Sequence, residues 1–150
     1  GVDLWRTAQQ VLPSTDSGSI QLNITMGDQQ VRLLGYDIDS GSAVPGGQVK
    51  VVLYWQALAP FTENYQVFTH LMTDELLAQH DGPPECGMMP TTHWLPGEII
   101  RDPHIISLPP DLASGDLQLV TGMYNLITQE RLSRTDTQAD TIHLTNVIIP

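Results

Sequence analysis

Two consecutive runs of alternating apolar residues limit this chain to a sheet-based fold more than any other feature. The residues that share one face are Val49, Val51, Leu53 and Trp55 in the first run, and Tyr65, Val67, Thr69 and Leu71 in the second. A period of two, rich in β-branched and aromatic residues, is typical of strands. Neither run is short or polar, as edge strands often are, so we expect both to be central strands.

Shorter runs of the same kind recur along the chain, at residues 20–24, 31–38, 76–80, 99–108, 117–124 and 142–147. Turn residues separate them, and the chain has 12 glycines and 11 prolines. We therefore predict an all-β, two-sheet antiparallel β-sandwich of about eight or nine strands over residues 20–150. Immunoglobulin-like and jelly-roll topologies both remain open. Residues 1–19 are predicted to form an N-terminal linker or a short helix.

The charge balance excludes some classes of partner. The chain has 17 acidic and 6 basic residues, a formal net charge of -11. Such a surface repels nucleic-acid phosphates and anionic lipid headgroups, so we expect no nucleic acid as a partner.

Cys86 is the single cysteine, so no intrachain disulfide can form. No run approaches the roughly 18 apolar residues of a membrane helix. Because Gly1 is preceded by neither an initiator Met nor a signal peptide, we expect the sequence to be a segment of a longer polypeptide.

An ordered series of short motifs resembles a known family. In chain order the motifs are Gly35-Tyr36-Asp37, Pro45-Gly46-Gly47, Leu53-Tyr54-Trp55-Gln56-Ala57, residues 65–71, Ala78-Gln79-His80-Asp81-Gly82-Pro83-Pro84, residues 90–98, Arg101-Asp102, residues 108–112, Gly122-Met123-Tyr124 and Glu130-Arg131-Leu132. They are similar to a β-sandwich domain at the C-terminal end of polytopic membrane glycosyltransferases of the dolichyl-phosphate-mannose mannosyltransferase type, common in filamentous green bacteria and their relatives. The resemblance covers residues 31–133. It departs at Thr73-Asp74-Glu75, where the family carries a longer, glycine-containing hairpin.

The resemblance implies an extracytoplasmic, non-catalytic appendage. Its partner would be the membrane-embedded remainder of the same polypeptide, which would tether the domain to the cell membrane. It supplies no binding residues to transfer to this chain, so a site must be sought among the residues themselves.

The segment from Asp81 to Pro96 is the strongest site candidate, because loops this long and proline-rich are uncommon in compact domains and often functional. The spacings of the His, Cys and acidic residues match no zinc site. The chain has no Gly-x-Ser-x-Gly motif that would indicate a nucleophilic serine. Asp37 with Asp39, or Asp81 with Glu85, could supply oxygen ligands to calcium, but two nearby acids are weak support. We predict no catalytic residue, no metal and no cofactor.

Three tryptophans are candidates for stacking on a sugar: Trp5, Trp55 and Trp94. Trp55 alternates with core residues, so we expect it to be buried. Trp94 lies in the irregular segment, where packing and ligand binding both remain open. The predicted ligand-binding residues are Trp94, His93, Asp81, His80 and Glu98, with Trp94 as an exposed platform and the polar groups bonding sugar hydroxyls.

The function predicted from sequence is therefore that of a non-enzymatic accessory domain with weak glycan binding. The first alternative is a purely structural or protein-interaction module with no small ligand. The second is a hydrolase or metal-dependent enzyme that uses residues 80–104.

Overall fold

The computed structural model describes residues 17–150 and consists almost entirely of strands. The elements are β1 (Ile20–Met26), β2 (Val31–Asp39), β3 (Gln48–Ala57), β4 (Tyr65–Met72), β5 (Leu76–Gly82), the 3-10 helices η1 (Pro84–Gly87) and η2 (Thr91–His93), β6 (Ile99–Ser107), β7 (Gly115–Asn125) and β8 (Ile142–Ile149). The predicted all-β sandwich is confirmed. The linker or short helix predicted at 1–19 falls almost wholly outside the described residues.

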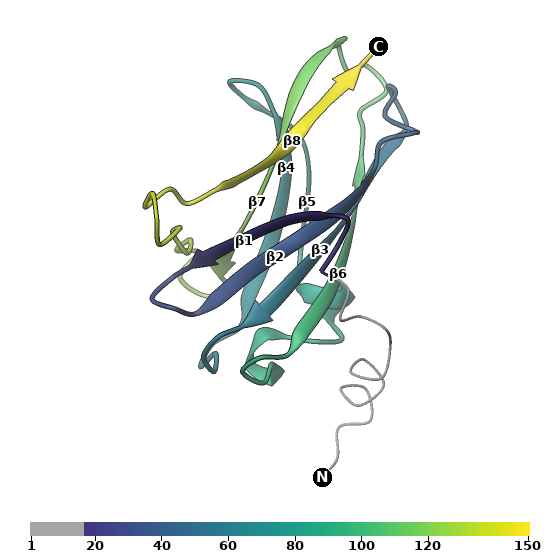
Figure 1. The fold of residues 1–150 in the computed structure, drawn as a ribbon. Helices are drawn as coiled ribbons and strands as arrows, with labels where there is room; N and C mark the ends of the chain where they lie inside the picture. Colours follow the sequence, from purple (N-terminus) through teal and green to yellow (C-terminus); the bar gives the residue numbers. More distant parts are fainter. Residues whose placement is uncertain (1–16) are drawn as a thin grey trace.

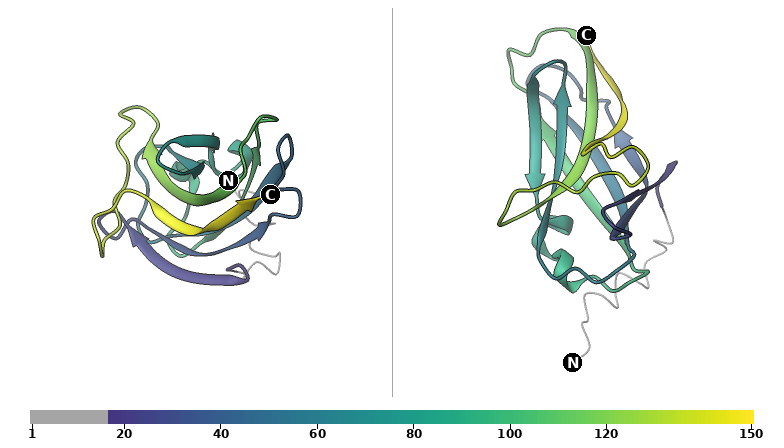
Figure 2. Two further views of the ribbon diagram at one scale, coloured as in Figure 1. Left: turned by 90° about the horizontal axis from the view of Figure 1, so that it is seen from above. Right: turned by 90° about the vertical axis from the view of Figure 1, so that its left-hand side faces the viewer.

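The strands form two four-stranded antiparallel sheets that face each other (Figures 1 and 2). Sheet A has the order β1-β2-β3-β6, and sheet B has the order β5-β4-β7-β8. Both β3 and β4 are central, as predicted. The order differs from the immunoglobulin constant-type arrangement, in which the first, second, fifth and fourth strands share a sheet.

The core lies between the sheets and is built from the alternation seen in the sequence. All four residues predicted to share the inner face of β3 are fully buried, and so are Val67 and Leu71 of β4. Leu119 and Met123 provide the matching inner face of β7. The inner faces predicted for β3 and β4 are therefore confirmed.

The outer face of sheet A carries a smaller apolar cluster that the alternation pattern did not predict. Leu34, Val52 and Tyr54 pack together there, with Ile99 beside them. The first strand also departs from simple alternation, because a register shift between Gln21 and Ile24 and a left-handed Asn23 interrupt its pairing. Ile20 is exposed although it pairs with the buried Tyr36, whereas Leu22 and Ile24 are partly buried against the core.

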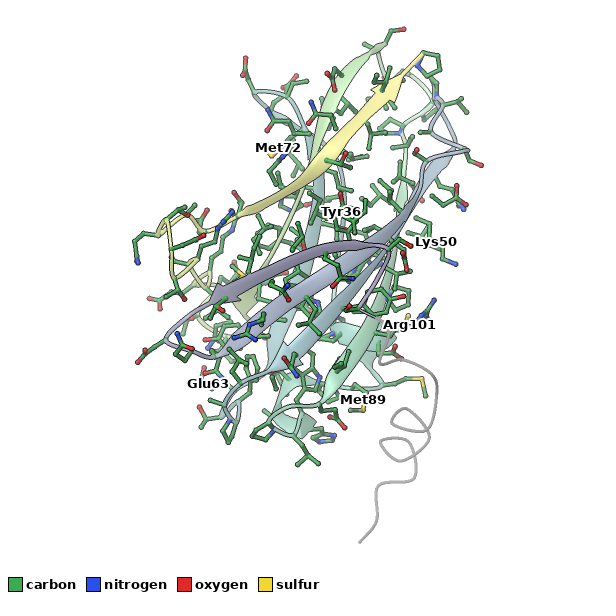
Figure 3. The ribbon with its side chains drawn as sticks, in the orientation of Figure 1. Tyr36, Lys50, Glu63, Met72, Met89 and Arg101 are labelled. Carbon is green, nitrogen blue, oxygen red and sulfur yellow. The ribbon has the colours of Figure 1, made fainter. Side chains whose placement is uncertain are left out.

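Two hydrogen-bonded links join the sheets across the sandwich. The hydroxyl of Tyr36 in β2 donates to the carbonyl of Leu144 in β8 at 2.9 Å, and Figure 3 shows Tyr36 between the sheets. The second link joins β5 to β6, the edge strands of different sheets, through His80 and His104. No helix within residues 17–150 is long and apolar enough to cross a membrane.

Candidate functional site

The segment 83–98, here called the end loop, closes one end of the sandwich, away from the C-terminus (Figure 1). The side chain of Thr91 accepts a hydrogen bond from the backbone N–H of Tyr65 at 3.0 Å and donates to the carbonyl of Glu63 at 2.9 Å. Trp94 donates its indole N–H to the carbonyl of Met89 at 2.8 Å. Glu63 and Met89 both lie at this end of the molecule in Figure 3.

Trp94 is packed inside the end loop, not displayed on it. Only 3% of its surface is exposed, and its ring meets the ring of Phe61 edge-on, with centroids 5.5 Å apart. A buried ring cannot stack on a sugar, so the expectation of an exposed platform is wrong and the packing alternative holds. The sequence was misleading because a long irregular loop can also pack its side chains into the main core, as Met89 and Trp94 do here. Trp55 is buried, as expected.

The other predicted site residues fall in two places. His93 is exposed on η2, whereas Glu98 is buried and accepts a hydrogen bond from the backbone N–H of Leu95. His80 and Asp81 are neighbours on β5 whose side chains leave opposite faces of the strand. His80 turns inward to His104, and Asp81 turns outward to His70 and Tyr124. Whether any of these residues touches a ligand stays a prediction.

The outward side of β5 belongs to a polar surface that spans three strands, here called the Asp81 face. Its residues are Phe68 and His70 of β4, Asp81 of β5, Tyr124 of β7, and Gln129 and Arg131 of the segment after β7. Antiparallel pairing places Asp81, Phe68 and Gly122 in one row across the sheet. Gly122 leaves space for the Phe68 ring, since a Cβ there would lie 2.5 Å from that ring.

A carboxylate occupies the centre of the Asp81 face. Asp81 Oδ1 lies 3.2 Å from His70 Nε2, and Asp81 Oδ2 accepts a hydrogen bond from the Tyr124 hydroxyl at 3.2 Å. Burial lowers the pKa of His70 below 6.5, although the Asp81 charge opposes this. Burial, followed by the Asp81 charge, raises the pKa of Tyr124 above 10.0. At neutral pH both partners are therefore uncharged donors to Asp81.

A guanidinium group completes the Asp81 face. Arg131 lies over the Phe68 ring, 4.3 Å from its centroid, and reaches Asp140 at 3.5 Å. The exposed Arg131–Asp140 pair contributes little stability, but the aromatic contact limits where the guanidinium can lie. Asp81, Tyr124, Gln129 and Arg131 line a pocket of about 240 Å³. It offers carboxylate, phenol, amide and guanidinium groups to one ligand.

The inner side of β5 carries a buried chain of hydrogen bonds. His80 Nδ1 lies 2.8 Å from His104 Nδ1, and His104 Nε2 lies 2.7 Å from Asp102 Oδ2. Asp102 also accepts hydrogen bonds from the Trp55 indole and the Glu85 backbone N–H. Asp102 and His104 are 0% and 1% exposed. The bond from the Glu85 N–H connects the end loop to Asp102 of β6.

Two observations on the described residues bear on the catalytic and metal alternatives. The rings of His80 and His104 bond to each other and to Asp102, and no hydroxyl or thiol of residues 17–150 joins them. No group of three or more His, Cys, Asp or Glu in that range could hold a metal. The Asp37 carboxylate accepts from Ser19 N and Tyr54, in a pocket that it shares with Lys50 and Arg101. Those cations disfavour calcium there.

Sequence reasoning missed most of the Asp81 face. Asp81 was among the predicted ligand-binding residues, but Tyr124, Gln129 and Arg131 were not. The only sequence signal for these residues is their position relative to the core residues of β7. Tyr124 alternates with those residues, and Gln129 and Arg131 follow them. Which strands pair with β4 cannot be read from alternation, and that pairing is what assembles the surface.

The comparisons with known proteins bear on the fold. The chain is similar to a solved structure described as the C-terminal domain of wzt, with a TM-score of 0.55 and 14% sequence identity. The match covers 89% of this chain and 81% of the other. No protein-family model matches the chain, and no curated protein matches it in sequence. At this identity the likeness establishes a shared β-sandwich fold.

Proposed function

We propose that this domain is a non-catalytic glycan-binding module and that the Asp81 face is its binding surface. The observation that carries the proposal is the pocket in which Asp81, Tyr124, Gln129 and Arg131 converge. Carboxylate, amide and guanidinium groups can each bond adjacent sugar hydroxyls, and the half-buried Tyr124 ring adds an apolar contact. The opposite charges of Asp81 and Arg131 favour a ligand rich in hydroxyls over a strongly charged one.

The wider context is part of the same proposal. The family resemblance suggests an accessory domain outside the cytoplasm, tethered to the membrane through a glycosyltransferase-like polypeptide. The solved structure with a similar fold is likewise a C-terminal domain. A shallow polar pocket should give a dissociation constant of roughly millimolar to tens of micromolar. Tethering beside a glycan would raise the effective concentration enough for such an affinity to matter.

The proposal is tested by a glycan-array screen, followed by calorimetric titration of the best sugar. In Asp81→Asn, the charge is lost while an acceptor oxygen for Tyr124 remains. Because hydrogen bonds to charged groups contribute about 1.5–3 kcal/mol, we expect affinity to fall on the order of tenfold to a hundredfold.

Asp116→Asn is the matched control, because Asp116 is an exposed carboxylate at the start of β7 in the same sheet. It should bind like the wild type. Equal losses in both variants would indicate a general charge effect and not this site. If no sugar binds at millimolar concentration, the structural or protein-interaction alternative replaces the proposal.

A further inference from the structure

We propose that the His80–His104 hydrogen bond, here called the clasp, holds β5 and Asp81 in the position that binds sugar. This hydrogen bond breaks when both rings are protonated. This inference rests on the proposed function and names its regulation.

The clasp joins the two sheets at one side of the sandwich. β5 is an edge strand of sheet B, β6 is an edge strand of sheet A, and the ring of His80 reaches across to the ring of His104. The rings meet edge-on, with centroids 4.9 Å apart. His80 is the residue before Asp81, so one peptide unit connects the clasp to the central carboxylate of the Asp81 face.

The geometry limits how many protons the two rings can share. Asp102 fixes a proton on His104 Nε2, because a carboxylate oxygen 2.7 Å away must accept. The Nδ1–Nδ1 bond then needs a single proton between the rings: either His80 donates to neutral His104, or charged His104 donates to neutral His80. A second proton would place two N–H groups and two positive charges against each other. The bond cannot survive that state.

The surroundings set the charge environment of the clasp. Asp102 contacts His104 directly, and the charge of Asp81 acts on His80 from the outer side of β5. Glu85 of η1 lies beside Asp102, and Arg101 is near it. Burial first, and then the charge of His104, lowers the pKa of His80 below 6.5, while Asp102 and Asp81 oppose this. Burial and Asp102 raise the pKa of Glu85 above 4.5. Burial of His80 therefore disfavours the second proton relative to a free histidine.

The direct test is nuclear magnetic resonance of the ¹⁵N-labelled wild-type domain between pH 7.5 and 4.5. At pH 7.5 we expect a scalar coupling across the Nδ1–Nδ1 hydrogen bond and a proton on His104 Nε2. On acidification the coupling should vanish in the same step that shifts the β5 amides of residues 78–82. Rings that titrate without moving β5, or the absence of coupling at pH 7.5, would overturn the clasp.

A second arm links the clasp to sugar affinity. In the wild type, affinity for the array-selected sugar should fall several-fold from pH 7 to 5, whereas His80→Gln, which cannot take up a proton, should show little pH dependence. His143→Gln, at an exposed histidine of β8, is the control and should follow the wild type. His70 contacts Asp81 directly, so a pH dependence that survives in His80→Gln but disappears in His70→Gln assigns the effect to His70 and overturns the proposal. If no sugar binds at any pH, the proposed function fails, and the coupling and β5 amides still decide the clasp.

Discussion

The end loop and the Asp81 face use aromatic side chains in opposite ways. In the end loop, the ring of Trp94 is buried against Phe61 and its N–H is satisfied by a backbone carbonyl. On the Asp81 face, the Phe68 ring underlies a guanidinium and the Tyr124 hydroxyl bonds a carboxylate at the surface. The comparison of the two regions shows that an irregular backbone segment is not by itself evidence of a binding site. Here the irregular segment closes the core, and the regular strands present the exposed polar groups.

The largest expected effect concerns Trp94. Trp94→Ala should cost about 3–5 kcal/mol of unfolding free energy, the usual range for removing a large buried aromatic. Leu95→Ala is the matched control, because its neighbouring side chain is half exposed and should change stability far less. Denaturant unfolding of both variants measures the difference. A Trp94→Ala variant as stable as the wild type would contradict the packed end loop and restore the exposed platform.

The next effect distinguishes the two sides of β7. Leu119→Ala should cost about 2–5 kcal/mol, because Leu119 is fully buried between the sheets. Gln118→Ala, on the outer side of the same strand, should change stability within about 0.5 kcal/mol. Urea midpoints of the two variants provide the check. Equal losses would mean that the inner and outer sides of sheet B are assigned the wrong way round.

The fold was largely predictable because burial on one side of a strand imposes alternation, and alternation survives in the sequence. Val49, Val51, Leu53 and Trp55 show this in β3, and Leu119 and Met123 show it in β7. In β1 a register shift between Gln21 and Ile24 interrupts the alternation, and nothing in the sequence pattern indicates it. The site was mostly unpredictable because its residues come from β4, β5, β7 and the segment after β7, which meet only through strand pairing. The exposure of Trp94 was predicted wrongly because the composition of a loop does not show whether an aromatic ring packs against a partner such as Phe61.

The smallest effect is a pH dependence of stability that originates at His70. Its lowered pKa means that the unfolded chain binds a proton near pH 6.5 while the folded chain does not. Its contribution to stability is therefore fully present above about pH 7 and is lost as pH falls through the folded pKa. Thermal unfolding of the wild type and His70→Gln between pH 5 and 8 isolates this part as their difference. A constant difference across that range would mean that His70 is not held neutral on the Asp81 face.

The most direct test of the central claim is to map where a sugar binds. In a ¹H–¹⁵N titration with the array-selected sugar, we expect progressive shifts of the Asp81, Tyr124, Gln129 and Arg131 signals, while the Trp94 indole signal stays fixed. That pattern would establish the Asp81 face as the binding surface and the end loop as structural. Shifts centred on His93 and the Trp94 indole, with Asp81 and Arg131 unmoved, would contradict the account.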